Sequence, residues 1–465
     1  MYSPAPVECR ANIFADIYLN QRVTKGQAYR SSQLRAKYPS IINAIDQTQH
    51  QRKRKFIGQV LTERSMRTFE PEMAEQIEIF LQLLLAFCRS DSVVNMTERC
   101  QRLGMDIVGL LSFGYPFKTQ TGEDFRFLPP VIEAMSWRIS TYMQFPPLTR
   151  LEPVLSLVGF RQVIKFLNSV RAMIKTRMSQ DKNAHHDLYS IVADHIGKDQ
   201  QGLYQGELWP EAILFIIAGG ATTATAMSAL FFYLSRNPEC YAALADEIRS
   251  KFNSASDIQA GPQLNACKYL RACIDEALRM SPPSLTALWR EQDAADDSGE
   301  PFIVDGHVIP RGTQVGVSLY SIMHNEEYFP DSFSFKPERW LESGPDAPAE
   351  GNVGEDAAGK KRKAEERATM RKAFAPFLIG DRSCAGRSMA YMETSLTIAR
   401  TFWYFDFEVA PEKAGELGRG KLGRTDGRGR PDEYQLYDIF VAAHQGPNLV
   451  FRTRGDFWKE LQTDG

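Results

Sequence analysis

The sequence predicts a mainly α-helical chain with small β-structures. Residues 72–112 and 126–180 carry apolar side chains at the spacing of amphipathic helices. Residues 212–235 form an uncharged run, long enough for a buried helix. Residues 302–317 place turn signals at Asp305-Gly306 and Pro310-Arg311-Gly312 between apolar residues, which is typical of a β-hairpin.

The composition is that of an ordinary globular protein. The 465 residues are 43% hydrophobic and 24% charged, and the formal net charge is −2. This near-neutral balance argues against nucleic acid as a partner. The seven cysteines are odd in number and lack paired spacing, so they indicate reduced, intracellular thiols and not a disulfide framework.

The first clear helical pattern opens at residues 49–56, after a stretch, 11–48, that shows no clear period. His50 and Arg54 stand four residues apart and so share one helix face. A solvated basic patch and a nucleic-acid or nuclear-import run are both compatible with this pattern.

Prolines punctuate the next helices at Pro129-Pro130 and Pro146-Pro147, and the polar residues 180–206 predict an exposed connection. The uncharged run 212–235 is long enough to cross a bilayer, but its centre of small residues suits a buried core helix equally well.

The helix predicted from residue 268 ends at Pro282-Pro283 and places Glu276 and Arg279 at i and i+3. Residues 343–372 are of low complexity and predict a solvated surface insert with a charged helical turn. After a helix over 388–402 and a glycine-rich loop, residues 440–451 predict strands.

The segment 377–386 carries the strongest chemical signal. Cys384 stands in a loop between Gly380, which permits positive φ, and Gly386, which permits close approach of a flat ligand. The helix that follows is expected to lower the pKa of the thiol. Arg382 offers a fork of donors for a carboxylate. This arrangement suits axial ligation of a haem iron, although a lone cysteine is more often a small buried hydrophobe.

The pattern Phe-x-x-Gly-x-Arg-x-Cys-x-Gly resembles the haem-binding signature of the cytochrome P-450 monooxygenases. Its fixed positions are Phe377, Gly380, Arg382, Cys384 and Gly386. The resemblance implies a mainly α fold with small β-sheets around a buried haem, in a single domain over residues 1–465 that is shortened at its N-terminus. It also implies that residues 126–180 include a mobile lid over the substrate.

Residues 218–223 resemble the oxygen-binding motif of the same family, although alone such a string is more often helix packing. The resemblance implies that Thr222, with Thr223, helps to relay protons. The chain departs from the pattern because Ala221 stands where the family has an acid. Ala218 and Gly219 would shape the substrate pocket.

Further residues match family positions. His50, Arg54 and Arg290 match positions that hold the haem propionates, and Leu285 and Leu288 match the substrate pocket. Glu276 and Arg279 resemble a buried pair that locks onto a second arginine, here Arg339.

The resemblance implies a haem b (iron-protoporphyrin IX) monooxygenase that hydroxylates or epoxidises a lipophilic small molecule, of fungal secondary-metabolite type. The reaction would use O2 and electrons from an NADPH-cytochrome reductase. The family works at the cytosolic face of the endoplasmic reticulum, and this chain is expected to be cytoplasmic or in peripheral membrane contact. A reductase-independent isomerase or peroxygenase and a non-catalytic remnant are the alternatives.

Overall fold

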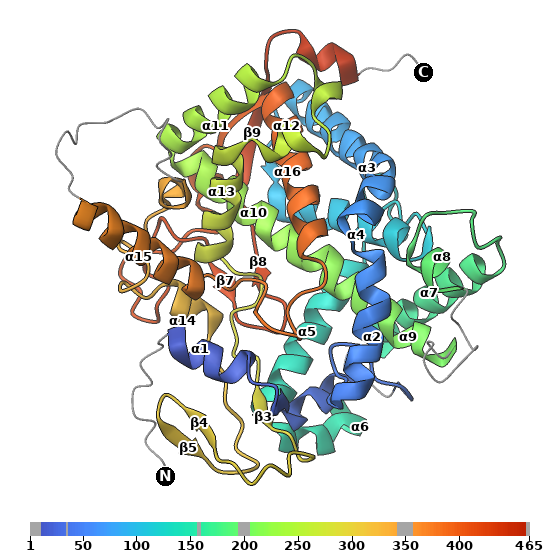
Figure 1. Cartoon of the computed structure of the whole chain (residues 1–465). Helices are drawn as coiled ribbons and strands as arrows, with labels where there is room; N and C mark the ends of the chain where they lie inside the picture. The colour runs from blue at the N-terminus through green and yellow to red at the C-terminus, as the bar shows by residue number, and fades with distance from the viewer. Residues whose placement is uncertain (1–10, 34–35, 156–159, 194–204, 342–356, 462–465) are drawn as a thin grey trace.

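The computed structural model describes residues 11–461 except 34–35, 156–159, 194–204 and 342–356. It confirms the predicted fold class, because helices make up most of the chain and the sheets are small and antiparallel. Figure 1 shows the helices wrapped around α10 (Ala221–Arg236), with the hairpin of β4 (Phe302–Val304) and β5 (His307–Ile309) at one end.

The helices differ widely in length, and the longer ones build the body of the molecule. The remaining helices are α1 (Ala11–Tyr18), α2 (Gln47–Val60), α3 (Glu63–Arg89), α4 (Met96–Phe113), α5 (Leu128–Gln144), α6 (Glu152–Leu155), α7 (Phe160–Met178), α8 (Leu188–Val192), α9 (Leu208–Phe215), α11 (Pro238–Lys251), α12 (Pro262–Asn265), α13 (Lys268–Met280), α14 (Leu319–Met323), α15 (Ala357–Ala373) and α16 (Arg387–Tyr404).

The predicted uncharged helix forms the centre of the core. It runs from α9 through a π-helical turn, Ile216–Gly220, into α10 without a break. The span Leu208–Arg236 is the one helix of the described residues that is long and apolar enough to cross a membrane, with a mean hydropathy of 1.7, but 67% of its apolar window is buried by protein. A Cβ on Gly104 would lie 2.5 Å from the Gly220 carbonyl oxygen, so α4 packs directly on the π-turn.

The strands form small antiparallel sheets. Strand β9 (Asn448–Thr453) pairs with β2 (Val94–Asn95) on one side and with β6 (Phe405–Val409) on the other. The predicted hairpin is confirmed, with Phe302 opposite Ile309. The predicted strands in 440–451 are shorter than expected: β8 (Ala443–His444) pairs with β7 (Leu436–Tyr437), and β9 then begins.

The segment 11–48 shows no clear period in the sequence, yet its first residues form the amphipathic helix α1. Ile13, Phe14, Ile17 and Tyr18 are buried along one face of α1. The helix is only eight residues long, which is too short for its periodicity to stand out. Strand β1 (Val23–Lys25) follows and pairs with β3 (Arg290–Gln292) in the register Lys25 to Arg290.

Two surface predictions also need correction. Residues 357–372, expected as a charged helical turn, belong to the 17-residue helix α15, which buries Met370 and Ala373 against the rest of the fold. The polar connection 180–206 is not wholly exposed, because Asp187 is buried in an ion pair with Arg177. Residues 343–356 and 194–204 of these two segments lie outside the described residues.

Candidate functional site

A tight backbone turn holds the cysteine loop. The Cys384 amide donates to the Phe377 carbonyl at 2.8 Å, and the Ser383 amide donates to the Gly380 carbonyl at 3.0 Å. Gly380 has φ of +74°, and a Cβ there would collide with the Tyr18 carbonyl oxygen. This position therefore requires glycine, as the motif predicted. Gly386 then caps α16.

The Cys384 thiol does not have the lowered pKa that the sequence predicted. Its side chain is open to solvent on one side, yet the surrounding protein desolvates it, and burial raises the pKa. The Gly386 amide, Arg54 and Arg387 act in the opposite direction but do not outweigh burial. A metal ion bound to the sulfur would remove the proton outright. The thiolate expected at this position therefore depends on a cation at the sulfur.

Beside this loop lies a pocket of about 240 Å³ with a basic wall. His50, Arg290, Arg382, Gly380 and Tyr18 line it, so three of the predicted cofactor-binding basic residues converge. Arg382 donates to the carbonyls of residues 44 and 45, at 3.0 Å each. These contacts fix the guanidinium of Arg382 at the pocket wall.

The electrostatics of this pocket favour an anion. Burial and the neighbouring cations lower the pKa of His50 to about 2, so this imidazole is neutral. Lys25 does not line the pocket, but burial and the nearby guanidinium groups of Arg382 and Arg290 lower its pKa well below the usual value. Lys25 is 3% exposed, donates to the Ile41 carbonyl and was missed by the sequence analysis, because no motif surrounds it.

The fourth predicted basic residue, Arg54, lies at the cysteine loop and not among the residues lining this pocket. Its guanidinium donates to the Ser383 carbonyl, which ties α2 to the loop. Taken together, the donor set fits a haem: basic groups suited to carboxylates stand beside a cysteine suited to iron. The contacts to the cofactor stay predictions.

The predicted oxygen-binding motif spans the π-turn and the start of α10. Thr222 Oγ1 donates to the Ala218 carbonyl at 2.6 Å, and Thr223 Oγ1 donates to the Gly219 carbonyl at 2.8 Å. Each hydroxyl therefore bonds back into its own helix, as threonines in helices do. The Ala218 side chain is exposed, while Gly219 is half-buried.

A buried acid beside this motif escaped the sequence analysis. Glu393 of α16 accepts a hydrogen bond from Thr223 Oγ1 at 3.1 Å. Its burial raises the pKa to about 8, so the carboxyl is mostly protonated at neutral pH. The only available signal was a glutamate within the apolar run after Cys384, which by itself does not distinguish a buried acid from an exposed one.

The predicted substrate-pocket leucines lie in the segment between α13 and β3. Leu285 is buried, and its carbonyl accepts a hydrogen bond from Ser318 Oγ at 3.2 Å. Leu288 is half-buried, and its carbonyl accepts one from Tyr18 Oη at 3.1 Å. Their contact with a substrate stays a prediction.

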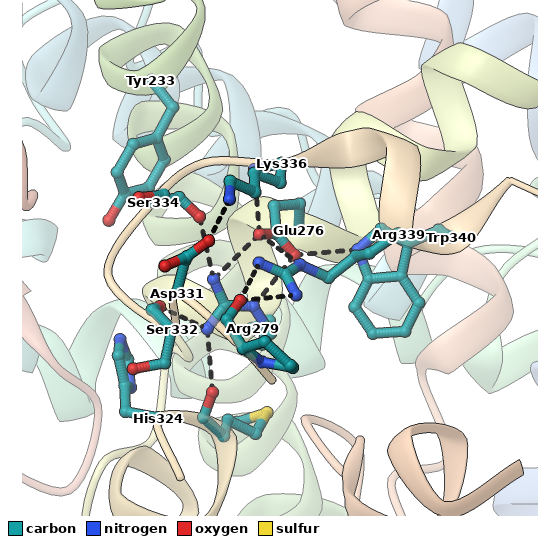
Figure 2. A network of polar contacts seen from close by, with 12 residues as sticks. Tyr233, Glu276, Arg279, His324, Asp331, Ser332, Ser334, Lys336, Arg339 and Trp340 are labelled. Atoms are coloured by element: carbon teal, nitrogen blue, oxygen red, sulfur yellow. Dashed lines mark hydrogen bonds and ion pairs between the residues drawn. The ribbon is translucent and has the colours of Figure 1, made fainter. Parts of the chain in front are cut away.

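The predicted ion pairs are present and fully hydrogen-bonded (Figure 2). Arg279 makes a bidentate contact with Glu276 at 2.8 and 2.9 Å, and both side chains are completely buried. Arg339 Nε and Trp340 Nε1 donate to the same carboxylate at 3.0 and 2.9 Å. Arg279 also donates to the carbonyls of residues 323 and 332. The network fastens α13 to the segment 323–340.

A helical fold, a cysteine on a rigid loop and a basic pocket beside it define a protein of the haem-thiolate class. Comparison with known families agrees, because the sequence model described as cytochrome P450 matches residues 15–423. The chain belongs to the cytochrome P450 family.

Curated relatives match along nearly the whole chain. A cytochrome P450 monooxygenase of Gibberella zeae is 32% identical over 447 residues, which is 94% of this chain and 97% of the relative. Cytochrome P450 monooxygenase poxM of Penicillium oxalicum is 32% identical over 95% of this chain and 80% of the relative. Cytochrome P450 monooxygenase AKT7 of Alternaria alternata is 30% identical over 93% of this chain and 81% of the relative. The protein is accordingly a haem-dependent oxidoreductase of the monooxygenase type.

Proposed function

We propose that this protein uses haem b to insert one oxygen atom of O2 into a lipophilic small molecule, by hydroxylation or epoxidation. The substrate would be a fungal secondary metabolite, and the electrons would come from an NADPH-cytochrome reductase. The observation that carries the proposal is the placement of Cys384 on a rigid loop next to His50, Arg290 and Arg382.

Each group would act through its own chemistry. Arg290 and Arg382 would hold the carboxylates of the cofactor, and Cys384 would bind its iron. When bound, the haem supplies the oxygen activation, and a thiolate ligand favours cleavage of the O–O bond. Thr222 would hold and pass protons at the exposed Ala218 face, and the buried Thr223 would do so from its contact with Glu393.

The cellular context follows from the same proposal. A reductase that feeds enzymes of this family is bound to the endoplasmic reticulum, so we propose that the protein works at the cytosolic face of that membrane. Exposed apolar side chains, among them Trp137, Phe145 and Val154 near α5 and α6, support a peripheral contact there.

Isotope labelling tests the reaction. The haem-loaded protein, a fungal NADPH-cytochrome reductase and NADPH would be incubated under heavy-isotope O2 with a lipid extract from a strain that lacks the gene. We expect one extract component to gain a single heavy oxygen atom, and only when NADPH and reductase are present. A product that gains its oxygen from water, or none at all, would contradict the proposal.

The absence of an acid at Ala221 supports a second candidate. An isomerase or peroxygenase needs no reductase and places less demand on delivering protons to O2. The same incubation with peroxide in place of NADPH and reductase separates the two functions. Faster conversion with peroxide alone would favour the second.

A further inference from the structure

A small cavity of about 30 Å³ lies against Ala221, at the start of α10. Glu133 and Ser136 of α5 line it from one side, and His444 of β8 lines it from another. It therefore occupies the position beside α10 where the family pattern would place a carboxylate. Its volume is sufficient for one water molecule.

Two enclosed polar atoms belong to residues that line this cavity. Ser136 Oγ and His444 Nε2 are buried, and neither has a hydrogen-bond partner among the described residues. Their residues are 1% and 6% exposed. Because native proteins rarely leave such atoms unpaired, each calls for a partner in the cavity.

The surroundings of His444 determine which roles its nitrogens take. Burial lowers the pKa of the imidazole to about 4, so the ring is neutral near pH 7. Nδ1 lies 3.4 Å from the Ala442 carbonyl oxygen, which can only accept, so Nδ1 carries the hydrogen. Nε2 is then an acceptor and needs a donor. Ser136 Oγ can both donate and accept, so a water can bridge the two atoms.

We propose that an ordered water in this cavity, held between Ser136 Oγ and His444 Nε2, is the entry point through which protons reach the motif on α10 in this chain. The proposal rests on the proposed monooxygenase function. Ser136 and His444 act as positioning residues for the water. The water takes the place of the carboxylate that Ala221 lacks.

The residues at the two ends of the cavity are consistent with protons entering from bulk water and moving toward α10. Glu133 is exposed and lies at the solvent side of the lining, where it can exchange protons with bulk water. Its pKa is raised by partial burial. At the inner side, Thr225 Oγ1 lies 3.5 Å from His444 Nδ1 and donates to the Ala221 carbonyl at 3.0 Å. His444 thus brings the cavity within reach of a hydroxyl group on α10, one helical turn from Ala221.

Glu393, the buried acid described above, lies near the same motif but contacts none of the residues proposed to hold the water. Glu393 reaches α10 from α16 and contacts Thr223, and it is not among the residues that line the cavity. A Glu393→Gln variant therefore leaves the cavity intact, and serves to separate the two groups experimentally.

The first test is structural and needs no turnover. A crystal structure of the haem-loaded protein is expected to show a water within hydrogen-bond distance of both Ser136 Oγ and His444 Nε2. Ala221→Asp is expected to displace that water, because a carboxyl group fills the cavity. A cavity that is dry or filled by protein atoms in the wild-type crystal would overturn the proposal.

The second test follows protons without a known substrate. With reductase, NADPH and O2 alone, electrons leave as peroxide (O2 + 2e⁻ + 2H⁺) or as water (O2 + 4e⁻ + 4H⁺). We expect Ser136→Ala to slow NADPH oxidation by about tenfold and to raise the solvent deuterium isotope effect. The double variant Ser136→Ala/Ala221→Asp is expected to recover both values. His444→Gln is a second variant in case Ser136→Ala does not fold.

The matched control is Ser112→Ala. Ser112 is another buried serine whose hydroxyl has no partner among the described residues, and it does not line the cavity. Equal rates and isotope effects for folded Ser136→Ala and Ser112→Ala would overturn the inference. The reduced, CO-bound spectrum is recorded for each variant. A missing thiolate band in the wild type would instead refute the proposed function itself.

Discussion

At the scale of single residues, burial decides the protonation of the groups around the site. Burial raises the pKa of Cys384 and Glu393, and it lowers the pKa of His50 and Lys25. In each case the neutral form is favoured, because a low-dielectric surrounding penalises charge. These four ionisable groups are therefore largely uncharged in the fold without ligand. A bound metal ion or anion would change their protonation.

The buried acid yields a pH-dependent prediction. An exposed glutamate titrates near 4.5, whereas Glu393 in the fold titrates near 8. Between these values the folded protein holds a proton that the unfolded chain releases, so the free energy of unfolding falls as pH rises, by at most about 1.4 kcal/mol per pH unit. Glu393→Gln is expected to flatten this slope. Denaturant titrations from pH 5 to pH 9 measure it.

The control for that series is Glu408→Gln, because Glu408 is an exposed glutamate in a surface ion pair with Arg452. It should keep the wild-type slope. An unchanged slope in Glu393→Gln would show that this carboxyl is ionised in the fold at neutral pH.

The positions of single residues were predicted correctly where those residues belong to a short sequence motif. Gly380 is placed in a left-handed turn as expected, and Glu276 meets Arg279. Prediction failed for Lys25, Glu393 and His444, because their burial arises from segments that are distant in the chain. The residues next to each of them in the sequence form no pattern that predicts a buried side chain.

At the scale of elements, the network on α13 shows how a buried charge is satisfied. Glu276 receives donors from Arg279 on its own helix and from Arg339 and Trp340 beyond β5 (Figure 2). A buried ion pair contributes little net stability when complete, but removing one partner leaves a buried charge unpaired.

Arg279→Ala is therefore expected to destabilise the fold by about 3–5 kcal/mol and to reduce haem incorporation strongly. The comparison is Arg271→Ala on the same helix, whose pair with Asp275 is partly exposed and should contribute less than about 1 kcal/mol. Chemical denaturation and haem content measure both effects. Normal haem occupancy in Arg279→Ala would refute a structural role for the pair.

Helices were predicted correctly from the sequence where the apolar pattern is long. The core helix through α10 and the helix after the cysteine loop were placed correctly, since long runs fix their period. Helices α1 and α15 were missed or underestimated. The first is short, and the second is polar apart from a few buried side chains near its end.

At the scale of the whole molecule, the site is assembled from segments spread over the chain. Strand β1, helix α2, strand β3 and the cysteine loop meet around one basic pocket. Sequence motifs identified α2, Arg290 and the loop, but not the β1 segment, whose role depends on pairing with β3. The family relationship covers this whole arrangement.

Because these segments share one ligand site, haem binding is expected to slow backbone amide exchange in all of them together. Residues 23–25, 47–60, 290–292 and 377–386 should gain protection on haem loading, whereas the hairpin 302–309, which does not line the pocket, should not. Hydrogen–deuterium exchange with and without haem measures this. Protection confined to the cysteine loop would contradict a shared pocket.

The central claim is that Cys384 binds the iron of a haem held by this pocket. The most direct measurement is the absorption spectrum of the reduced, CO-bound protein, for the wild type and for Cys384→His with equal haem content. The account predicts a red-shifted thiolate band in the wild type and its loss in the variant. A wild-type protein that binds haem without that band, or a variant that keeps it, would contradict the account.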